Sequence, residues 1–468
     1  MKLSRTPEEE VERLEMLVPN KGFCPAPFVH TWINANNGGF KLCCMSKIIK
    51  RWDPTKDLQS QFQEYWSSKE MQEIRKDFLN GKYPSVCDFY CGKYEREKLH
   101  HQNDRLNFIQ KYHNDLVSKG DLESLNDLEF YVVKGNKHGK PLDIDLRPSN
   151  LCNLKCRSCN TVWSTEIQKE VLANPEIQGW SHWDTISFST QKWKKRTTDE
   201  WEDHTLGITK NLDFSNVFRL KLTGGESFID PRVAEILSNI VENGHAKNIH
   251  FHTITNCTSI PTKIYNSLKQ FKSVSFSFSF DGYKQVDEFL REGTIWDKKI
   301  KVLDKILTLP NIKWSQFMHV VQPVSVFHLI DHVGFFLLMI RTNESIRGVD
   351  FNPIVDPKFL HVGWLDDDHK EHILSLIDQC KEVYNMTNSE MWWFDTLKSE
   401  LNTDFKDKRI IHCNDFVRHQ LALDKIRNTH TLSITPQLQR YFDRYDSNNV
   451  SKTTHDSVTS QYVEEKNE

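Results

Sequence analysis

The run Leu142-Asp-Ile-Asp-Leu-Arg-Pro-Ser-Asn-Leu-Cys-Asn-Leu-Lys-Cys-Arg-Ser-Cys-Asn160 holds Cys152, Cys156 and Cys159 in a CxxxCxxC spacing. Its first six residues alternate apolar and polar side chains, which predicts a β-strand that ends just before the cysteines. Three thiolates can ligate three irons of a 4Fe–4S cluster and leave the fourth iron open to a substrate or cosubstrate. A structural zinc site is the alternative, although zinc normally takes four ligands.

The composition is that of an ordinary globular chain. Of its 468 residues 38% are hydrophobic and 27% are charged, and the net charge of −3 argues against nucleic acid as a partner. The N-terminus lacks the apolar core of a signal peptide, and the most apolar run, residues 333–340, is too short to span a bilayer. We therefore expect a cytoplasmic protein without a membrane partner, whose eleven cysteines are metal ligands rather than disulfides.

Strand-like and helical segments alternate from about residue 141 to residue 360. The expected strands are 142–148, 217–223, 248–256, 273–281, 313–322 and 348–353. The expected helices between them are 232–241, 262–271, 298–309 and 329–341. Six such alternations predict an α/β fold with a parallel sheet, built as a partial (β/α)6 barrel similar to a TIM barrel.

The other segments differ in composition from this core. We expect residues 1–105 to form a small N-terminal β-hairpin and helix module and residues 106–140 to form a connector. Residues 174–212, with four tryptophans, are an insertion in the 141–360 core that suits a lid, a partner surface or a small local core. Residues 361–445 are expected to be helical, and the polar tail, residues 446–468, to be disordered.

Small and polar residues follow the ends of the expected strands, where ligands bind in such folds. Gly224 and Gly225 let a ligand approach the backbone closely, and the Glu226 carboxylate can accept hydrogen bonds from an ammonium group. The next two strands end in residues suited to ribose hydroxyls, for which a turn or capping role is the alternative: Asn256, Ser279 and Asp281.

A second cysteine group lies near the N-terminus. Cys24 and Cys43 flank a predicted hairpin, with strands at 28–34 and 39–43 and a turn at 36–39, that would bring the two thiols together. Cys87 and Cys91 follow a predicted helix. Four thiolates suit one metal centre without an open position, either an iron–sulfur cluster or structural zinc. Cys44 adjoins Cys43, and the glycine spacing favours Cys43 as the ligand.

Residues 141–360 resemble the radical S-adenosylmethionine (radical SAM) superfamily. The resemblance lies in the CxxxCxxC motif after the first strand, the Gly-Gly-Glu after the second strand and the polar residues that end the next two strands. The N-terminal group, with its C-x(13)-G-x(4)-C hairpin, resembles the SPASM and twitch auxiliary-cluster modules of that superfamily, although those modules usually follow the barrel.

The resemblance implies a mechanism and a set of partners. Cys152, Cys156 and Cys159 would ligate the catalytic 4Fe–4S cluster, and S-adenosylmethionine would bind beside Gly224, Gly225, Glu226, Asn256, Ser279 and Asp281. Cys24, Cys43, Cys87 and Cys91 would hold an auxiliary 4Fe–4S cluster. A reductase or a flavodoxin- or ferredoxin-type protein would supply electrons, and the 5′-deoxyadenosyl radical would act on a substrate that is by analogy a peptide or protein. The alternative is a non-catalytic zinc-binding adaptor with a degenerate barrel.

Overall fold

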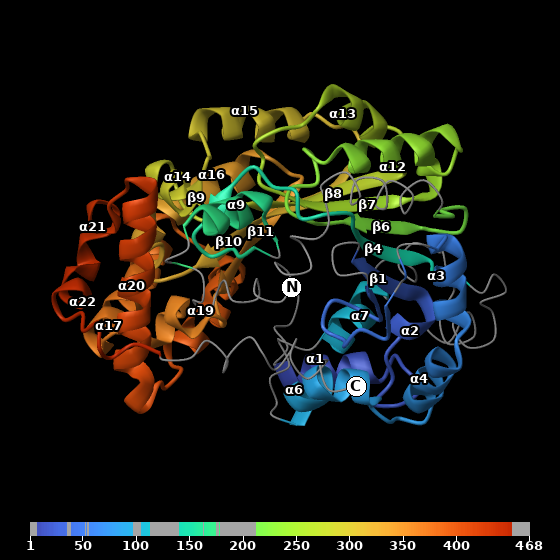
Figure 1. Cartoon of the computed structure of the whole chain (residues 1–468), viewed down its shortest axis with the longest axis horizontal. Coiled ribbons are helices and arrows are strands. Elements are labelled where there is room, and N and C mark those ends of the chain that lie inside the picture. Colours follow the sequence, from blue (N-terminus) through green and yellow to red (C-terminus); the bar gives the residue numbers. More distant parts are fainter. Residues whose placement is uncertain are drawn as a thin grey trace. The chain divides into compact units, whose positions relative to one another are not determined.

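A computed structural model of the chain describes residues 7–34, 39–51, 53, 56–96, 104–112, 140–161, 163–174, 177 and 212–451. The chain divides into two compact units. The first comprises Met1–Ser149, Asp199–Thr223 and Ser238–Phe251, and the second comprises Asn150–Thr198, Gly224–Leu237 and His252–Glu468. Both units contain strands and helices, so the fold is α/β (Figure 1).

The first unit holds one end of a mostly parallel sheet, in the order β7-β6-β4-β1-β2-β3. Its strands are β1 (His30–Asn34), β2 (Gly39–Lys41), β3 (Lys50–Arg51), β4 (Asp143–Arg147), β6 (Arg219–Leu222) and the first residues of β7 (His250–Thr255). β1 pairs in parallel with β4, from His30 opposite Asp143 to Asn34 opposite Arg147. β4 also pairs in parallel with β6, whereas β2 and β3 continue from β1 as antiparallel strands.

The helices of the first unit bury apolar side chains at helical spacing. They are α1 (Pro7–Glu15), α2 (Ala26–Val29), α3 (Leu58–Ser67), α4 (Lys69–Leu79), α5 (Ser85–Cys87), α6 (Lys93–Arg96), α7 (Asp104–Tyr112) and the last residues of α12 (Pro231–Glu242). Met71, Ile74 and Phe78 line the buried face of α4. Leu106 and Ile109 of α7 pack with Leu14 of α1 in one apolar cluster.

The second unit holds strands in the order β11-β10-β8-β7. These strands are β8 (Ser273–Ser279), β10 (Ile312–Val321), β11 (Ile346–Pro353) and the last residues of β7, and β10 pairs in parallel with both β8 and β11. A separate antiparallel pair joins β5 (Lys155–Cys156) to β9 (Arg291–Glu292). β8 has an apolar and a polar face, because Phe276 and Phe278 stack on one face while Ser275 and Ser277 lie on the other.

Helices pack on the phenylalanine face of these strands. The helices of this part are α9 (Thr165–Ala173), the first residues of α12, α13 (Thr262–Leu268), α14 (Gln285–Leu290), α15 (Trp296–Leu307) and α16 (Leu329–Thr342). Phe317 of β10 contacts Phe335 and Phe336 of α16, and the Phe280 ring meets the Trp296 ring edge-on at 5.7 Å. Figure 1 shows α13 and α15 together on one side of the strands of this unit.

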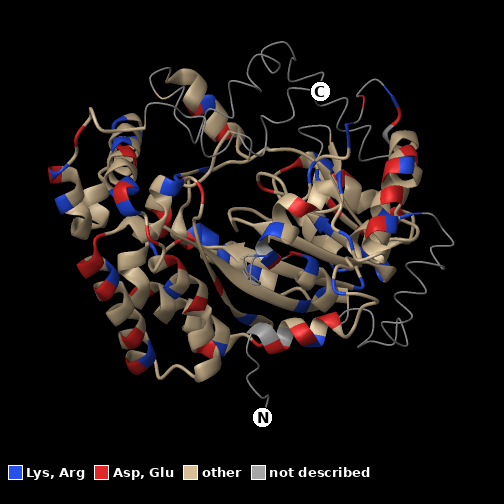
Figure 2. Cartoon of the chain, turned by 90° about the horizontal axis from the view of Figure 1, so that it is seen from below, with Lys and Arg blue, Asp and Glu red and all other residues tan. Residues whose placement is uncertain are grey.

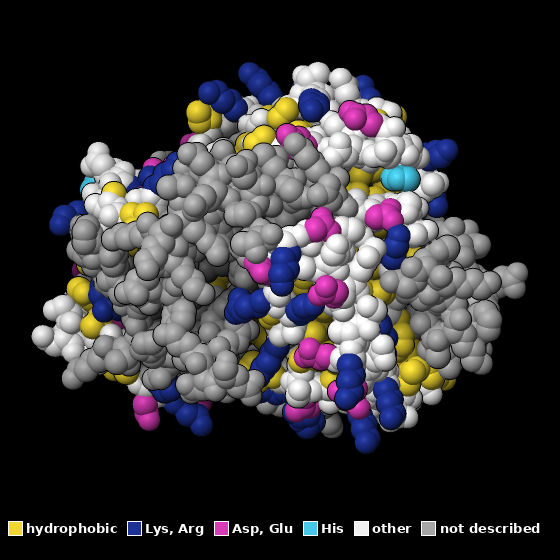
Figure 3. Space-filling model, turned by 45° about the vertical axis from the view of Figure 1, so that its right-hand side comes forward, with side chains coloured by type: hydrophobic (Ala, Val, Ile, Leu, Met, Phe, Trp, Pro, Cys, Tyr) yellow, Lys and Arg dark blue, Asp and Glu magenta, His cyan; other side chains and the backbone are white. Residues whose placement is uncertain are grey.

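The C-terminal part of the second unit is helical, as the sequence predicts. It contains α17 (Asp367–Val383), α18 (Asn388–Met391), α19 (Asp395–Leu401), α20 (Arg409–Arg427), α21 (Thr431–Ile434) and α22 (Gln439–Asp443). Figure 1 shows α17, α20, α21 and α22 grouped together. None of the described helices is long and apolar enough to cross a membrane. Basic and acidic side chains are interspersed along the helices and on the described part of one face, in keeping with the small net charge (Figures 2 and 3).

The expected domain boundaries remain predictions. Within the first unit, β1 of the N-terminal segment is hydrogen-bonded to β4, the first strand of the expected 141–360 core. Helix α7 occupies the start of the expected connector, where Ile109 and Tyr112 are fully buried. Most of the expected insertion, 174–212, and of the expected tail, 446–468, lies outside the described residues.

Candidate functional site

The cysteine loop after β4, residues 150–160, is buried and mostly irregular, and its backbone is hydrogen-bonded on several sides within the second unit. The Cys152 amide donates to Thr165 Oγ1 at 3.2 Å, and the Arg157 amide donates to the Leu290 carbonyl at 2.8 Å. Ser164 Oγ donates to the Leu154 carbonyl at 2.8 Å and also caps α9, since it accepts from the Ile167 amide. The loop is therefore fixed by the start of α9 and by the last residue of α14.

The turn after β6 packs against the same loop. A Cβ atom at Gly225 would lie 2.3 Å from the Leu151 carbonyl oxygen and 2.6 Å from that of Asn150. In the same turn the Glu226 amide donates to the Leu151 carbonyl at 2.8 Å. Glycine is therefore required at position 225 by the close approach of two backbones.

The Glu226 carboxylate connects this turn to the end of β7. It accepts hydrogen bonds from the Asn256 amide at 2.5 Å, from Thr255 Oγ1 at 2.9 Å and from the Phe228 amide at 3.1 Å. The residue is 1% exposed, and burial raises the pKa of its carboxyl group. A carboxylate offers about four acceptor positions, so these bonds leave room for about one further donor.

Asn256 ties the end of β7 to the cysteine loop. Its Nδ2 donates to Asn153 Oδ1 at 3.1 Å, and the same Asn153 oxygen accepts from Thr258 Oγ1 at 3.3 Å. Asn153 lies next to Cys152 in the sequence. The structure thus brings Asn256, Glu226 and the cysteine loop together, through hydrogen bonds that the protein makes with itself.

The three thiols of the loop share one cluster of side chains around the buried Leu154. Burial raises the pKa of the Cys152 thiol to about 12, with a smaller contribution from the neighbouring Cys156. Burial also raises the pKa values of Cys156 and Cys159. The thiols of the metal-free chain are therefore protonated at neutral pH, and iron binding must release their protons.

Arg291 lies opposite Cys156 in the β5–β9 pair. Its guanidinium donates to Asp281 Oδ2 at 2.7 Å, and the Val320 amide donates to Asp281 Oδ1 at 3.0 Å. Burial is the largest single influence and would raise the pKa of the Asp281 carboxyl group, but the charges of Arg291 and His319 and the hydrogen bonds from Val320 and Arg291 together lower it. Arg291 therefore turns inward to a fully buried carboxylate and is not a surface residue.

Two more polar side chains lie near the strand ends. Ser279, at the end of β8, is partly exposed, and its carbonyl accepts from Lys299 Nζ at 2.9 Å. Gln322, directly after β10, is fully buried, and neither amide atom of its side chain has a hydrogen-bond partner. A buried amide without partners is costly, so Gln322 is a group that a polar ligand would satisfy. Gly224 lies in the turn after β6, next to Gly225.

The N-terminal cysteines line a pocket in the first unit. Its wall contains Cys24, Cys43, Cys87 and Cys91, together with Ala26, Leu42, Phe78, Tyr83, Asp104, Arg105 and Phe108. Burial raises the pKa of the Cys91 thiol to about 11. The buried Arg105 guanidinium donates to Glu95 Oε1 at 2.6 Å, so one cation lies among the four thiols. Cys44 is exposed instead, and its Sγ donates to Asp104 Oδ2 at 3.4 Å.

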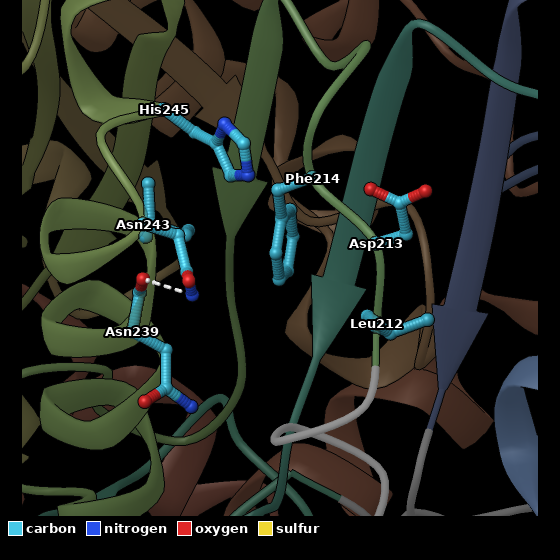
Figure 4. Close-up of a pocket in the computed structure, with 7 residues that line it drawn as sticks. Leu212, Asp213, Phe214, Asn239, Asn243 and His245 are labelled. Carbon is cyan, nitrogen blue, oxygen red and sulfur yellow. Dashed lines mark hydrogen bonds between the residues drawn. The ribbon is translucent and has the colours of Figure 1, made fainter.

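Two further observations concern the described residues only. Among them, no three His, Cys, Asp or Glu side chains are grouped so as to hold a single metal ion. Another pocket, of about 150 Å³, lies between the end of α12 and the segment before β6 and contains none of the predicted site residues (Figure 4). Its wall is formed by Leu212, Asp213, Phe214, Asn239, Ile240, Asn243 and His245.

Comparisons with known proteins give distant structural neighbours. No family model and no curated protein matches the chain. Similar solved structures include SuiB of Streptococcus suis bound to S-adenosylmethionine (16% identity, 82% of this chain and 76% of that chain, TM-score 0.31). They also include SuiB bound to the precursor peptide SuiA (15%, 83% and 79%, 0.32) and anSMEcpe with bound AdoMet (17%, 54% and 62%, 0.33). TM-scores of this size do not establish a common fold, so the function of this chain must be inferred from its own residues.

The close approach at Gly225 generates a first prediction. Gly225→Ala forces the turn and the cysteine loop apart, and we expect it to lower the free energy of unfolding by about 1–3 kcal/mol and to reduce iron uptake. Ser227→Ala is the matched control, since it removes a buried hydroxyl that has no hydrogen-bond partner. Chemical denaturation measures the free energy of unfolding, and iron analysis measures the uptake. If both quantities were equal in the two variants, the close contact of Gly225 with the cysteine loop would be contradicted.

The buried pair of Asp281 and Arg291 generates a second prediction. Asp281→Asn leaves the guanidinium without its carboxylate, and we expect a loss of about 3–5 kcal/mol in stability at neutral pH. The folded pKa of Asp281 is lowered, so its contribution is complete above the unfolded value of about 3.9 and disappears as the pH falls through the folded value. The stability gap between wild type and variant must therefore narrow below about pH 4; a gap independent of pH would refute the pairing.

Proposed function

We propose that the chain is a radical S-adenosylmethionine enzyme. The observation that carries the proposal is the set of three thiols on one loop that the Gly-Gly-Glu turn holds in place: Cys152 and Cys156, which are buried, and Cys159, which is partly buried. Three cysteines are the donor set that a 4Fe–4S cluster with one open iron requires. Held there, such a cluster would supply one electron for the reductive cleavage of S-adenosylmethionine to methionine and a 5′-deoxyadenosyl radical, which would abstract hydrogen from the substrate.

The residues around the loop have separable roles in this proposal. Gly224 would place the backbone of the turn beside the methionyl part of the cosubstrate, Gly225 packs that turn against the cysteine loop, and Glu226 has about one acceptor position left for the ammonium group. Ser279 and Gln322 offer polar groups at strand ends for the ribose or the adenine. Asn256 and Asp281 hold the strand ends through internal hydrogen bonds, and any contact with the ribose would be added to that role.

The substrate and the electron donor are assigned by resemblance alone. A peptide or protein is the first substrate class to test, and a flavodoxin- or ferredoxin-type protein is the first class of donor. We also assign an auxiliary 4Fe–4S cluster to Cys24, Cys43, Cys87 and Cys91, supported by the pocket that these thiols share. Four thiolates would leave that cluster no open iron, so it would relay electrons or shape the substrate pocket.

The decisive experiment is a cleavage assay. The anaerobically reconstituted protein with S-adenosylmethionine and a strong reductant should form 5′-deoxyadenosine, because the open iron binds and reduces the cosubstrate. The Cys152/Cys156/Cys159→Ala variant should form none. If the wild type binds zinc and no iron under these conditions, the proposal is wrong and the zinc-binding adaptor is the better description.

The auxiliary site is tested by a pair of adjacent cysteines. Cys43→Ala should lower the iron content by up to about four per chain, because Cys43 lines the pocket with the other three thiols. Cys44→Ala should leave the iron content unchanged, since Cys44 is exposed and bonded to Asp104. The reverse result would make Cys44 the ligand, and zinc lost in place of iron would show a structural zinc site.

A further inference from the structure

Arg157 belongs to the cysteine motif, yet its side chain is bound to the C-terminal helical region. Its Nη1 donates to Gln420 Oε1 of α20 at 2.7 Å, and its Nη2 donates to Asp424 Oδ1 at 2.7 Å and to Thr429 Oγ1 at 2.6 Å. The residue is 1% exposed. A guanidinium this deeply buried is stable only while these acceptors surround it.

The opposite side of Arg157 is fixed as well. The guanidinium stacks 3.8 Å from the centre of the Phe289 ring of α14, and the Arg157 amide donates to the Leu290 carbonyl. The residue between Cys156 and Ser158 is thus held from α14 on one side and from α20 on the other. A planar guanidinium suits this position because it can stack and donate several hydrogen bonds at the same time.

A second group of contacts joins α20 to the helix that follows the cysteine loop. Arg427 makes a two-point ion pair with Glu170 of α9, at 3.0 and 2.6 Å, and Glu170 also pairs with Lys155 of the loop at 3.1 Å. Leu423 of α20 shares an apolar cluster with Ile167 and Val171 of α9, and Cys159 packs against that cluster. Both the polar and the apolar contacts therefore reach the segment that carries Cys156 and Cys159.

We propose that α20 is a clamp that fixes the separation of Cys156 and Cys159, with Arg157 as its positioning residue. The clamp is a property of the metal-free chain, and its purpose, to hold the thiols ready for iron, rests on the proposed function. The loop-facing side of α20, with its buried Gln420 and Leu423, is then part of the cluster scaffold and is not available as a substrate-docking surface.

Thiol reactivity in the metal-free full-length chain tests the clamp directly. Arg157→Ala removes the three donated hydrogen bonds, whereas Asp424 keeps its bonds from Thr429 Oγ1 and the Thr431 amide. We expect Cys156 and Cys159 to react with an alkylating reagent about tenfold faster or more, because local opening becomes easier. Cys380 of α17, fully buried in the same unit, reports global opening and should keep its rate.

Matched variants separate positioning from general damage. Arg409→Ala, at the start of α20, removes a partly exposed ion pair with Asp367. It should leave the alkylation rates of Cys156, Cys159 and Cys380 at the wild-type values. Arg157→Lys keeps the charge but not the fork of donors, and should give intermediate rates at Cys156 and Cys159. Faster reaction of Cys380 together with the others would show global destabilisation, and unchanged rates at Cys156 and Cys159 would show that α20 does not hold them; either result overturns the proposal.

Iron retention gives a second readout that separates the two proposals. The iron bound by wild type beyond that of the Cys152/Cys156/Cys159→Ala variant belongs to the loop site, and Arg157→Ala should lose this fraction to a chelator several-fold faster. Suppose that Arg157→Ala speeds alkylation of Cys156 and Cys159 as expected, but that wild type and the triple variant bind equal iron. The clamp proposal is then supported and the radical-enzyme proposal fails. If the loop site binds iron and Arg157→Ala changes neither its retention nor the alkylation rates, the clamp fails alone.

Discussion

The requirement that a buried, irregular backbone must still have its polar groups hydrogen-bonded shapes most of the second unit. The cysteine loop has little regular structure of its own, so many of its backbone bonds come from neighbouring segments. The turn after β6, the start of α9 and the last residue of α14 each supply one or more of these bonds, and Asn256 at the end of β7 bonds to the side chain of Asn153. Segments far apart in the sequence therefore converge on residues 150–160, and a change in any of them reaches the thiols.

The same requirement acts on charges. Arg291 is paired with Asp281, Lys299 with Asp287, and Arg157 with Asp424, and at least one member of each pair is completely buried. Isolated charges in these positions would be prohibitively costly, so the pairs are a condition of folding more than a source of stability. Their hydrogen bonds also engage the oxygens of carboxylates such as Asp281 within the protein. A cosubstrate would then meet a site whose charges are largely balanced before it binds, with Gln322 as a polar group still without a partner.

Features of the fold that depend on local periodicity could be predicted from the sequence. The strands expected at 142–148, 273–281 and 313–322 are present as β4, β8 and β10. In the first two, the alternation of apolar and polar side chains is a property of the segment itself. The contacts that hold the cysteine loop are of another kind. Arg157 and Asp424 are separated by 267 residues, and no local pattern marks them as partners. Arg291 likewise follows a short helix, where an arginine followed by glutamate is usually a surface pair.

The parallel pairing of β1 with β4 could not be predicted for the same reason, yet it changes how the N-terminal segment is understood. Without β1, that edge of β4 would present unbonded amides and carbonyls, which favours association with other chains. β1 hydrogen-bonds to this edge of β4 along five residue pairs. β2 and β3 then extend the sheet as short antiparallel strands. Cys43 lies two residues after the end of β2, so the hairpin that completes the sheet also carries a thiol to the pocket of four cysteines. The N-terminal cysteine group is therefore built onto the sheet of the first unit, and its geometry depends on the β1–β4 pairing.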